Sequence, residues 1–155
     1  MKLPIRMAQE CHIGPPMVTM LMVDPQDHRT VWAGVEVAGV YRSLDGGDTW
    51  THVEGGVHPD IHGIAISLGQ PKKVLASTPR EIFATTDMGE SWQSVVTTDR
   101  FPLRYSRGIA IKPADNSRGS VFLRDSSPRW WCIPIMERGI HADGCLLPIA
   151  RLLGK

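Results

Sequence analysis

Three residues that could bind a ligand alternate along the segment His58-Pro59-Asp60-Ile61-His62. In an extended chain, residues two apart share a face, so two imidazoles and a carboxylate could point the same way. That donor set suits zinc or a divalent iron-type ion. The alternative is a turn shaped by Pro59 and capped by Asp60, with both histidines exposed. The sequence favours the turn over a metal and predicts no metal and no cofactor, while His58, Asp60 and His62 remain candidates for contact with another ligand.

A second candidate is Arg107, which follows Arg104 and Tyr105. The segment Gly-Ile-Ala-Ile occurs twice, starting at Gly63 and at Gly108, and Arg107 precedes the second copy as His62 precedes the first. Two arginines close together would suit a carboxylate or a phosphate. The alternative is that they only solvate a loop. We therefore include Arg107 among the expected ligand-binding residues.

The composition argues against several other classes of function. The chain has 155 residues, of which 42% are hydrophobic and 21% charged, with a net charge of +1 and three cysteines. It has neither the clustered Lys and Arg of nucleic-acid and anionic-membrane binders nor the roughly 20 apolar residues of a membrane helix. No phosphate-binding glycine loop, His-Glu-x-x-His or Gly-x-Ser-x-Gly motif is present. Because residues 1–10 show no apolar signal-type run, we expect a cytoplasmic protein with free thiols.

The elements that must position these residues are marked by a motif that occurs twice. Ser43 to Trp50 and Thr85 to Trp92 both read hydroxyl-x-Asp-x-Gly-x-hydroxyl-Trp. In a hairpin turn, Asp can accept backbone N–H groups and Gly can adopt a positive φ, while the closing Trp buries a large apolar face. We expect structural roles for the defined positions, which are Ser43, Asp45, Gly47, Thr49, Trp50, Thr85, Asp87, Gly89, Ser91 and Trp92.

Short apolar runs surround both motifs and predict strands. A first group of four lies at residues 17–23, 30–33, 39–42 and 49–53, and a second at 61–66, 73–76, 81–84 and 91–95. A third group begins with runs at 106–111 and 120–123. Groups of four short strands that recur every 40 or so residues are typical of propeller blades. The predicted fold class is therefore all-β, with antiparallel four-stranded blades, two complete and one partial.

Both copies of the motif fit Ser/Thr-x-Asp-x-Gly-x-Thr/Ser-Trp/Phe, so the chain resembles the Asp-box, or BNR, repeat β-propellers. That family includes sialidases, xyloglucan-specific glucanases and sortilin-type receptors. The resemblance implies that the motif lies between the third and fourth strands of each blade, away from the ligand face. It also implies that His58 to His62 lie at the mouth of the central channel. Because propellers close with four or more blades, the chain would be a fragment of a six- to eight-bladed propeller.

Two functions follow from the resemblance. The first is a non-catalytic propeller fragment that binds a small ligand or a protein on its channel face. The alternative is a fragment of a sialidase-like or glucanase-like glycoside hydrolase. Sialidases carry a Phe/Tyr-Arg-Ile-Pro segment, whereas Leu3-Pro4-Ile5-Arg6 and Phe101-Pro102-Leu103-Arg104 have the wrong order. We therefore expect binding rather than catalysis, and the catalytic residues of the alternative stay unknown.

The repeat pattern ends near residue 124. A third motif is due near residue 130, where the sequence reads Pro128-Arg129-Trp130-Trp131-Cys132. We divide the chain into a leader at 1–16, propeller blades at 17–124 and an atypical tail at 125–155. A frameshift or truncation near residue 124 is favoured over a genuine capping tail, and open sheet edges are expected to promote self-association.

Overall fold

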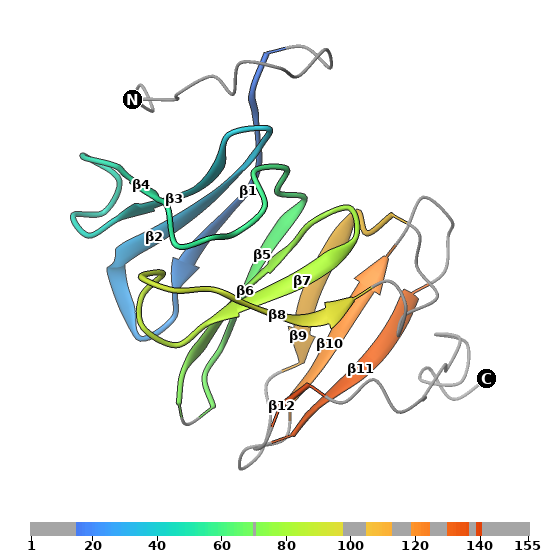
Figure 1. Ribbon diagram of the computed structural model, residues 1–155. Coiled ribbons are helices and arrows are strands. Elements are labelled where there is room, and N and C mark those ends of the chain that lie inside the picture. The colour runs from blue at the N-terminus through green and yellow to red at the C-terminus, as the bar shows by residue number, and fades with distance from the viewer. Residues whose placement is uncertain are drawn as a thin grey trace.

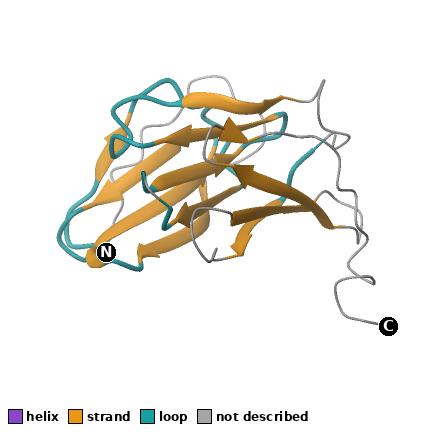
Figure 2. Ribbon diagram, turned by 90° about the horizontal axis from the view of Figure 1, so that it is seen from below, coloured by secondary structure: helices purple, strands orange, loops and turns teal. Residues whose placement is uncertain are grey.

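The computed structural model describes residues 15–69, 71–97, 105–112, 119–124, 130–136 and 139–140. Within these ranges the chain forms strands and no helix (Figures 1 and 2), so this part of it offers no helix that could cross a membrane. The strands are β1 (Met17–Asp24), β2 (Asp27–Glu36), β3 (Gly39–Ser43), β4 (Thr51–Val53), β5 (Gly63–Ser67), β6 (Lys73–Ser77), β7 (Glu81–Thr85), β8 (Gln93–Thr97), β9 (Gly108–Lys112), β10 (Gly119–Arg124), β11 (Trp130–Met136) and β12 (Gly139–Ile140).

The strands form three four-stranded sheets in which each strand pairs antiparallel with its neighbour in the chain. The first sheet holds β1 to β4, the second β5 to β8 and the third β9 to β12. The first strands of the sheets lie side by side, because β1 contacts β5 and β5 contacts β9 (Figure 1). Consecutive four-stranded meanders with their first strands together are the arrangement of propeller blades. The predicted all-β class is confirmed.

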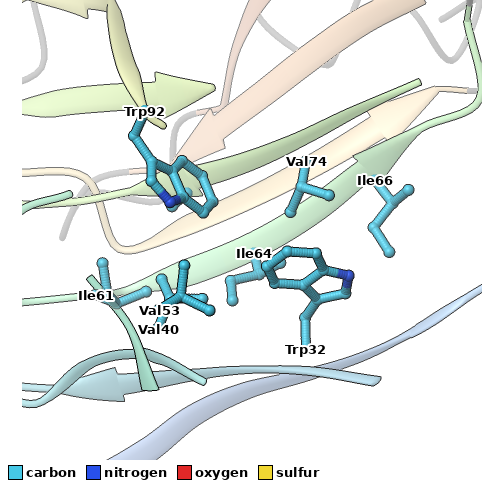
Figure 3. Packing of buried hydrophobic residues seen from close by; sticks show 9 residues of the cluster. Trp32, Val40, Val53, Ile61, Ile64, Ile66, Val74 and Trp92 are labelled. Atoms are coloured by element: carbon cyan, nitrogen blue, oxygen red, sulfur yellow. The ribbon is translucent and has the colours of Figure 1, made fainter. Parts of the chain in front are cut away.

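The core lies between the first and second sheets (Figure 3). Trp32 and Val40 from the first sheet pack against Ile64 and Trp92 from the second. The two tryptophans meet edge to face, with ring centroids 6.4 Å apart. Successive residues of a strand point to opposite faces, and Ala33, next to Trp32, is buried in a separate apolar cluster. β2 is therefore buried on both of its faces.

The third sheet contains two strands that the sequence did not predict. β11 pairs with β10, and β12 pairs with the end of β11. This corrects the expectation that the third blade stops after its second strand near residue 124. Pro134 obscures the pattern, because proline lacks a backbone N–H and argues against a strand interior. Among the described residues, β12 pairs with Ile135 and Met136, and Pro134 pairs with Ser120 of β10.

The two repeated motifs form the turns from β3 to β4 and from β7 to β8. In the first turn, Ser43 Oγ donates to Asp45 Oδ1 at 2.7 Å and accepts from Gly47 N at 2.8 Å. Asp45 also accepts from Thr49 N at 2.9 Å and from Thr49 Oγ1 at 2.5 Å. The second turn repeats these bonds, with lengths of 2.6 to 3.3 Å, through Thr85, Asp87, Gly89 and Ser91. Each carboxylate is thus engaged within its own turn, as a structural role requires.

The two motif tryptophans differ in burial. Trp92 is 8% exposed in the core, as expected, whereas Trp50 is only half-buried. Trp50 packs on the other face of the first sheet, against the cluster that includes Ala33 and Tyr41, and its Nε1 donates to Gly47 O at 2.9 Å. The expectation that both rings are largely buried therefore holds for Trp92 and not for Trp50, because Trp50 faces away from the second sheet.

The aspartates of the two turns make the stability of the fold depend on pH. Hydrogen bonds from Thr49 lower the pKa of Asp45, and hydrogen bonds from Ser91 and Thr85 lower the pKa of Asp87. A carboxyl group whose pKa is lower in the folded chain than in the unfolded chain, where it is about 4, stabilises the fold above about pH 4. This stabilisation is lost as the pH falls from about 4 toward the pKa of the folded state. In unfolding titrations from pH 7 to pH 2, a double variant with Asp45→Asn and Asp87→Asn should lose less stability than the wild type. Equal losses in the two proteins would contradict this assignment.

Candidate functional site

The predicted ligand residues lie on the side of the sheets opposite the two Asp turns. This side carries the hairpin from β2 to β3 and the segments that lead into β5 and β9, because strand direction alternates in each meander. Gly39 N donates to Pro59 O at 2.8 Å, which ties the β2–β3 hairpin to the segment before β5. His62 N donates to Ser77 O at 2.8 Å and places His62 directly before the first strand of the second sheet.

His62 is the buried centre of this side. Its side chain is 3% exposed, and that of Asp60 is 15% exposed. His62 Nδ1 is hydrogen-bonded to the main-chain carbonyl of Ser106, which leads into β9. A carbonyl only accepts, so Nδ1 carries a proton and the other ring nitrogen, Nε2, faces Asp60 Oδ1 at 3.3 Å. The predicted pair Asp60 and His62 is therefore brought together.

Glu36 joins the pair from the end of β2. Each of the three side chains, Glu36, Asp60 and His62, offers one ligand atom, and these three atoms lie within 4.8 Å of one another. Sequence reasoning missed Glu36, because its distance along the chain from Asp60 hides the contact. The available signal is topological: in a meander the end of the second strand lies on the same side as the start of the next blade.

His58 does not join the group. Its exposed ring lies on its own turn, where Asp60 N donates to His58 Nδ1 at 3.1 Å. The sequence offered a turn as the alternative to a three-residue site, but the turn differs from that expectation: the His58 ring, and not Asp60, accepts its hydrogen bond, and His62 is buried. Because Nδ1 already accepts a hydrogen bond, only Nε2 of His58 is free of the turn.

Tyr105 and Arg107 extend the site toward the third sheet. The Tyr105 ring lies 4.7 Å from the His62 ring, at an interplanar angle of 49°. The guanidinium carbon of Arg107 lies 4.9 Å from the centre of the Tyr105 ring, and the Arg107 side chain is exposed. The third residue of this predicted group, Arg104, lies outside the described residues.

These contacts form a continuous polar row across segments that belong to all three sheets. The polar row consists of Glu36, Asp60, His62, Tyr105 and Arg107. Carboxylates stand at one end and a guanidinium at the other, with two rings between them. Such a row can accept hydrogen bonds at one end and donate them at the other, which suits a ligand with many hydroxyl groups.

Part of this chain is similar to two curated proteins that are named as xyloglucanases. An oligoxyloglucan-reducing end-specific xyloglucanase of Emericella nidulans is 31% identical over 108 residues, which cover 65% of this chain. A xyloglucanase of Paenibacillus sp. is 27% identical over an alignment of 158 residues, covering 76% of this chain. The chain spans only 13% and 15% of these two relatives. No family model matches the sequence.

Solved structures show the same fold. An ancestral GH74 enzyme superposes with a TM-score of 0.53 and 18% identity, over 77% of this chain and 18% of that one. The GH74 enzyme of Niastella koreensis gives a TM-score of 0.54 and 19% identity, over 76% of this chain and 19% of that one. With the three meander sheets, these likenesses establish a β-propeller fold.

Proposed function

We propose that this chain is a segment of an Asp-box β-propeller and that its polar row binds a xyloglucan-type oligosaccharide without cleaving it. The observation that carries the proposal is the polar row itself, which gathers side chains from segments of all three sheets. The two Asp turns support the assignment to Asp-box repeats, since each carboxylate serves its own turn on the opposite side.

The chemistry of the row fits a neutral saccharide. Sugar hydroxyls both donate and accept hydrogen bonds, so they can pair with Glu36 at one end and with Arg107 at the other. Both of these side chains reach solvent, whereas His62 is buried and supports the row from beneath. Two of the similar proteins are named xyloglucanases, and this favours a glucan over other polar ligands.

The surroundings of Asp60 argue against cleavage by this carboxylate. Retaining and inverting glycosidases both use a pair of carboxyl groups that flank the scissile bond. Asp60 Oδ1 is buried and faces His62 Nε2 at 3.3 Å, so this oxygen is not offered to a glycosidic bond.

A hydrolase remains the second candidate because of the relatives' names. In that case the segment would contribute to substrate binding while the reacting carboxylates stand elsewhere in a longer propeller. Release of reducing sugar by this chain that disappears in an Asp60→Asn variant would instead place a reacting carboxylate within the chain itself and overturn the non-catalytic proposal.

Arg107→Ala tests the binding site. Calorimetric titration with xyloglucan oligosaccharides should show binding that weakens by about ten- to a hundredfold in this variant, since one charged hydrogen-bond donor to the ligand contributes about 1.5 to 3 kcal/mol. Arg29→Ala is the matched control, because Arg29 is exposed on the opposite side, where its carbonyl accepts from Gly46 N. Equal affinities in the wild type and Arg107→Ala, or equal weakening in both variants, would remove the polar row as the binding site.

A further inference from the structure

Two buried polar atoms of the polar row face each other without a hydrogen bond. Asp60 Oδ1 and His62 Nε2 lie 3.3 Å apart, and neither has a hydrogen-bond partner among the residues that the structure describes. Both atoms are shielded from solvent. An unsatisfied buried polar atom costs about 1 to 3 kcal/mol, and more when it is charged. The pair therefore needs a further group.

The tautomer of His62 defines what that group must be. Nδ1 carries the proton that the Ser106 carbonyl accepts, so in the neutral ring Nε2 presents a lone pair. That lone pair faces the lone pairs of Asp60 Oδ1, and two such groups repel each other. A positive charge between them removes the repulsion. A proton on Nε2 would supply it, but the two atoms are close without being aligned for a hydrogen bond.

We propose that Glu36, Asp60 and His62 bind a divalent transition-metal ion, with Zn²⁺ as the ion that fits best. Ligand atoms about 2.0 to 2.2 Å from zinc, set at tetrahedral angles, lie roughly 3.3 to 3.6 Å from one another. The 3.3 Å between Nε2 and Oδ1 matches this spacing. The Glu36 carboxylate is within 4.8 Å and half-buried, so a change of side-chain rotamer can complete the third bond.

The surroundings of His62 support a metal ligand. Metal-binding histidines almost always donate their second ring N–H to a carbonyl or carboxylate, and the Ser106 carbonyl has this role here. An imidazole ligand favours zinc-like ions over Mg²⁺ and Ca²⁺, which prefer oxygen ligands throughout. Three protein ligands leave a fourth tetrahedral position for water or a ligand group.

This site differs from the one considered from the sequence, which combined His58 with Asp60 and His62 and favoured no metal. The structure places His58 on its own turn and Glu36 beside the pair. The proposal does not rest on saccharide binding, because it follows from the buried pair alone. Its test uses metal without any sugar, so the two proposals can fail separately.

The test is a titration of the full chain, prepared metal-free, with ZnCl₂ at neutral pH. We expect one equivalent of Zn²⁺ to bind, with affinity at least about tenfold weaker in Glu36→Gln. His58→Gln is the matched control, since it removes an exposed neighbouring imidazole, and it should keep wild-type affinity. Glu36→Gln changes a half-buried residue, so circular dichroism can verify that the variant folds. In a second measurement, bound Co²⁺ should give the intense visible absorption of a tetrahedral site.

Four outcomes would overturn the proposal. If no Zn²⁺ binds, the buried pair is not a metal site. If His58→Gln weakens binding as much as Glu36→Gln, the ion sits on the exposed histidine. If Glu36→Gln binds as tightly as the wild type, the three-residue site is wrong. Equal binding of Mg²⁺ and Zn²⁺ would likewise contradict an imidazole ligand.

Discussion

Replacing Trp92 with alanine is expected to lower the free energy of unfolding by about 3 to 5 kcal/mol. The Trp92 ring is 8% exposed and lies in the cluster that joins the first and second sheets. Its edge-to-face contact with Trp32 would be lost, and a cavity would open between the sheets. The measurement is equilibrium unfolding in urea, with the slope checked for two-state behaviour.

Trp50→Ala is the matched control, because Trp50 stands at the equivalent place of the first motif and is only half-buried. The free energy of unfolding should fall clearly less in Trp50→Ala than in Trp92→Ala. A Trp92→Ala loss below about 1 kcal/mol, in the range of an ordinary substitution, would mean that the motif tryptophan does not hold the two sheets together.

Gly89→Ala is expected to destabilise the fold by roughly 2 to 5 kcal/mol. Gly89 has a φ of +92°, a left-handed conformation that costs other residues about 1 to 2 kcal/mol. An added Cβ would lie 2.6 Å from Val53 Cγ1 and 3.3 Å from the Trp32 ring. Because both neighbours belong to the buried core, the overlap adds about 1 to 3 kcal/mol of overpacking.

Gly46→Ala separates the two causes. Gly46 has a similar φ of +81°, and no described atom lies within 4 Å of an added Cβ. Gly46→Ala should lower the free energy of unfolding by only about 1 to 2 kcal/mol, which comes from the backbone conformation alone. Thermal or urea unfolding of both variants gives the comparison, and equal losses would show that the contact between the sheets at Gly89 is loose.

The sequence predicted the first two sheets well because their signals are local. Each motif combines a turn aspartate, a glycine and a closing tryptophan within eight residues, and apolar runs flank both copies. The third sheet was harder, because β11 follows no such motif and Pro134 interrupts its apolar run. β11 is recognisable as a strand only once β10 is in place beside it. Its strand character therefore depends on the sheet and not on its own sequence.

The candidate site was predictable in part. Asp60 and His62 are two residues apart, so the sequence could place them together. Glu36 could not be found from spacing, because strand topology alone brings β2 to the segment before β5. The role of the Ser106 carbonyl was also hidden, since any residue type presents the same main-chain oxygen. The types and spacing of the side chains thus revealed Asp60 and His62, whereas the backbone arrangement was needed to find Glu36 and the Ser106 carbonyl.

The crowding at Gly89 also limits how the repeats can diverge after duplication. An added Cβ at Gly55, at the end of the first repeat, would lie 2.5 Å from Gly89 O in the second. The first motif has Gly46 where the second has Met88, and both adopt a positive φ, so the two copies differ at this position although a non-glycine residue is strained there. The next position is glycine in both copies, Gly47 and Gly89. A larger residue at Gly55 or Gly89 would therefore require a matching change in the neighbouring repeat.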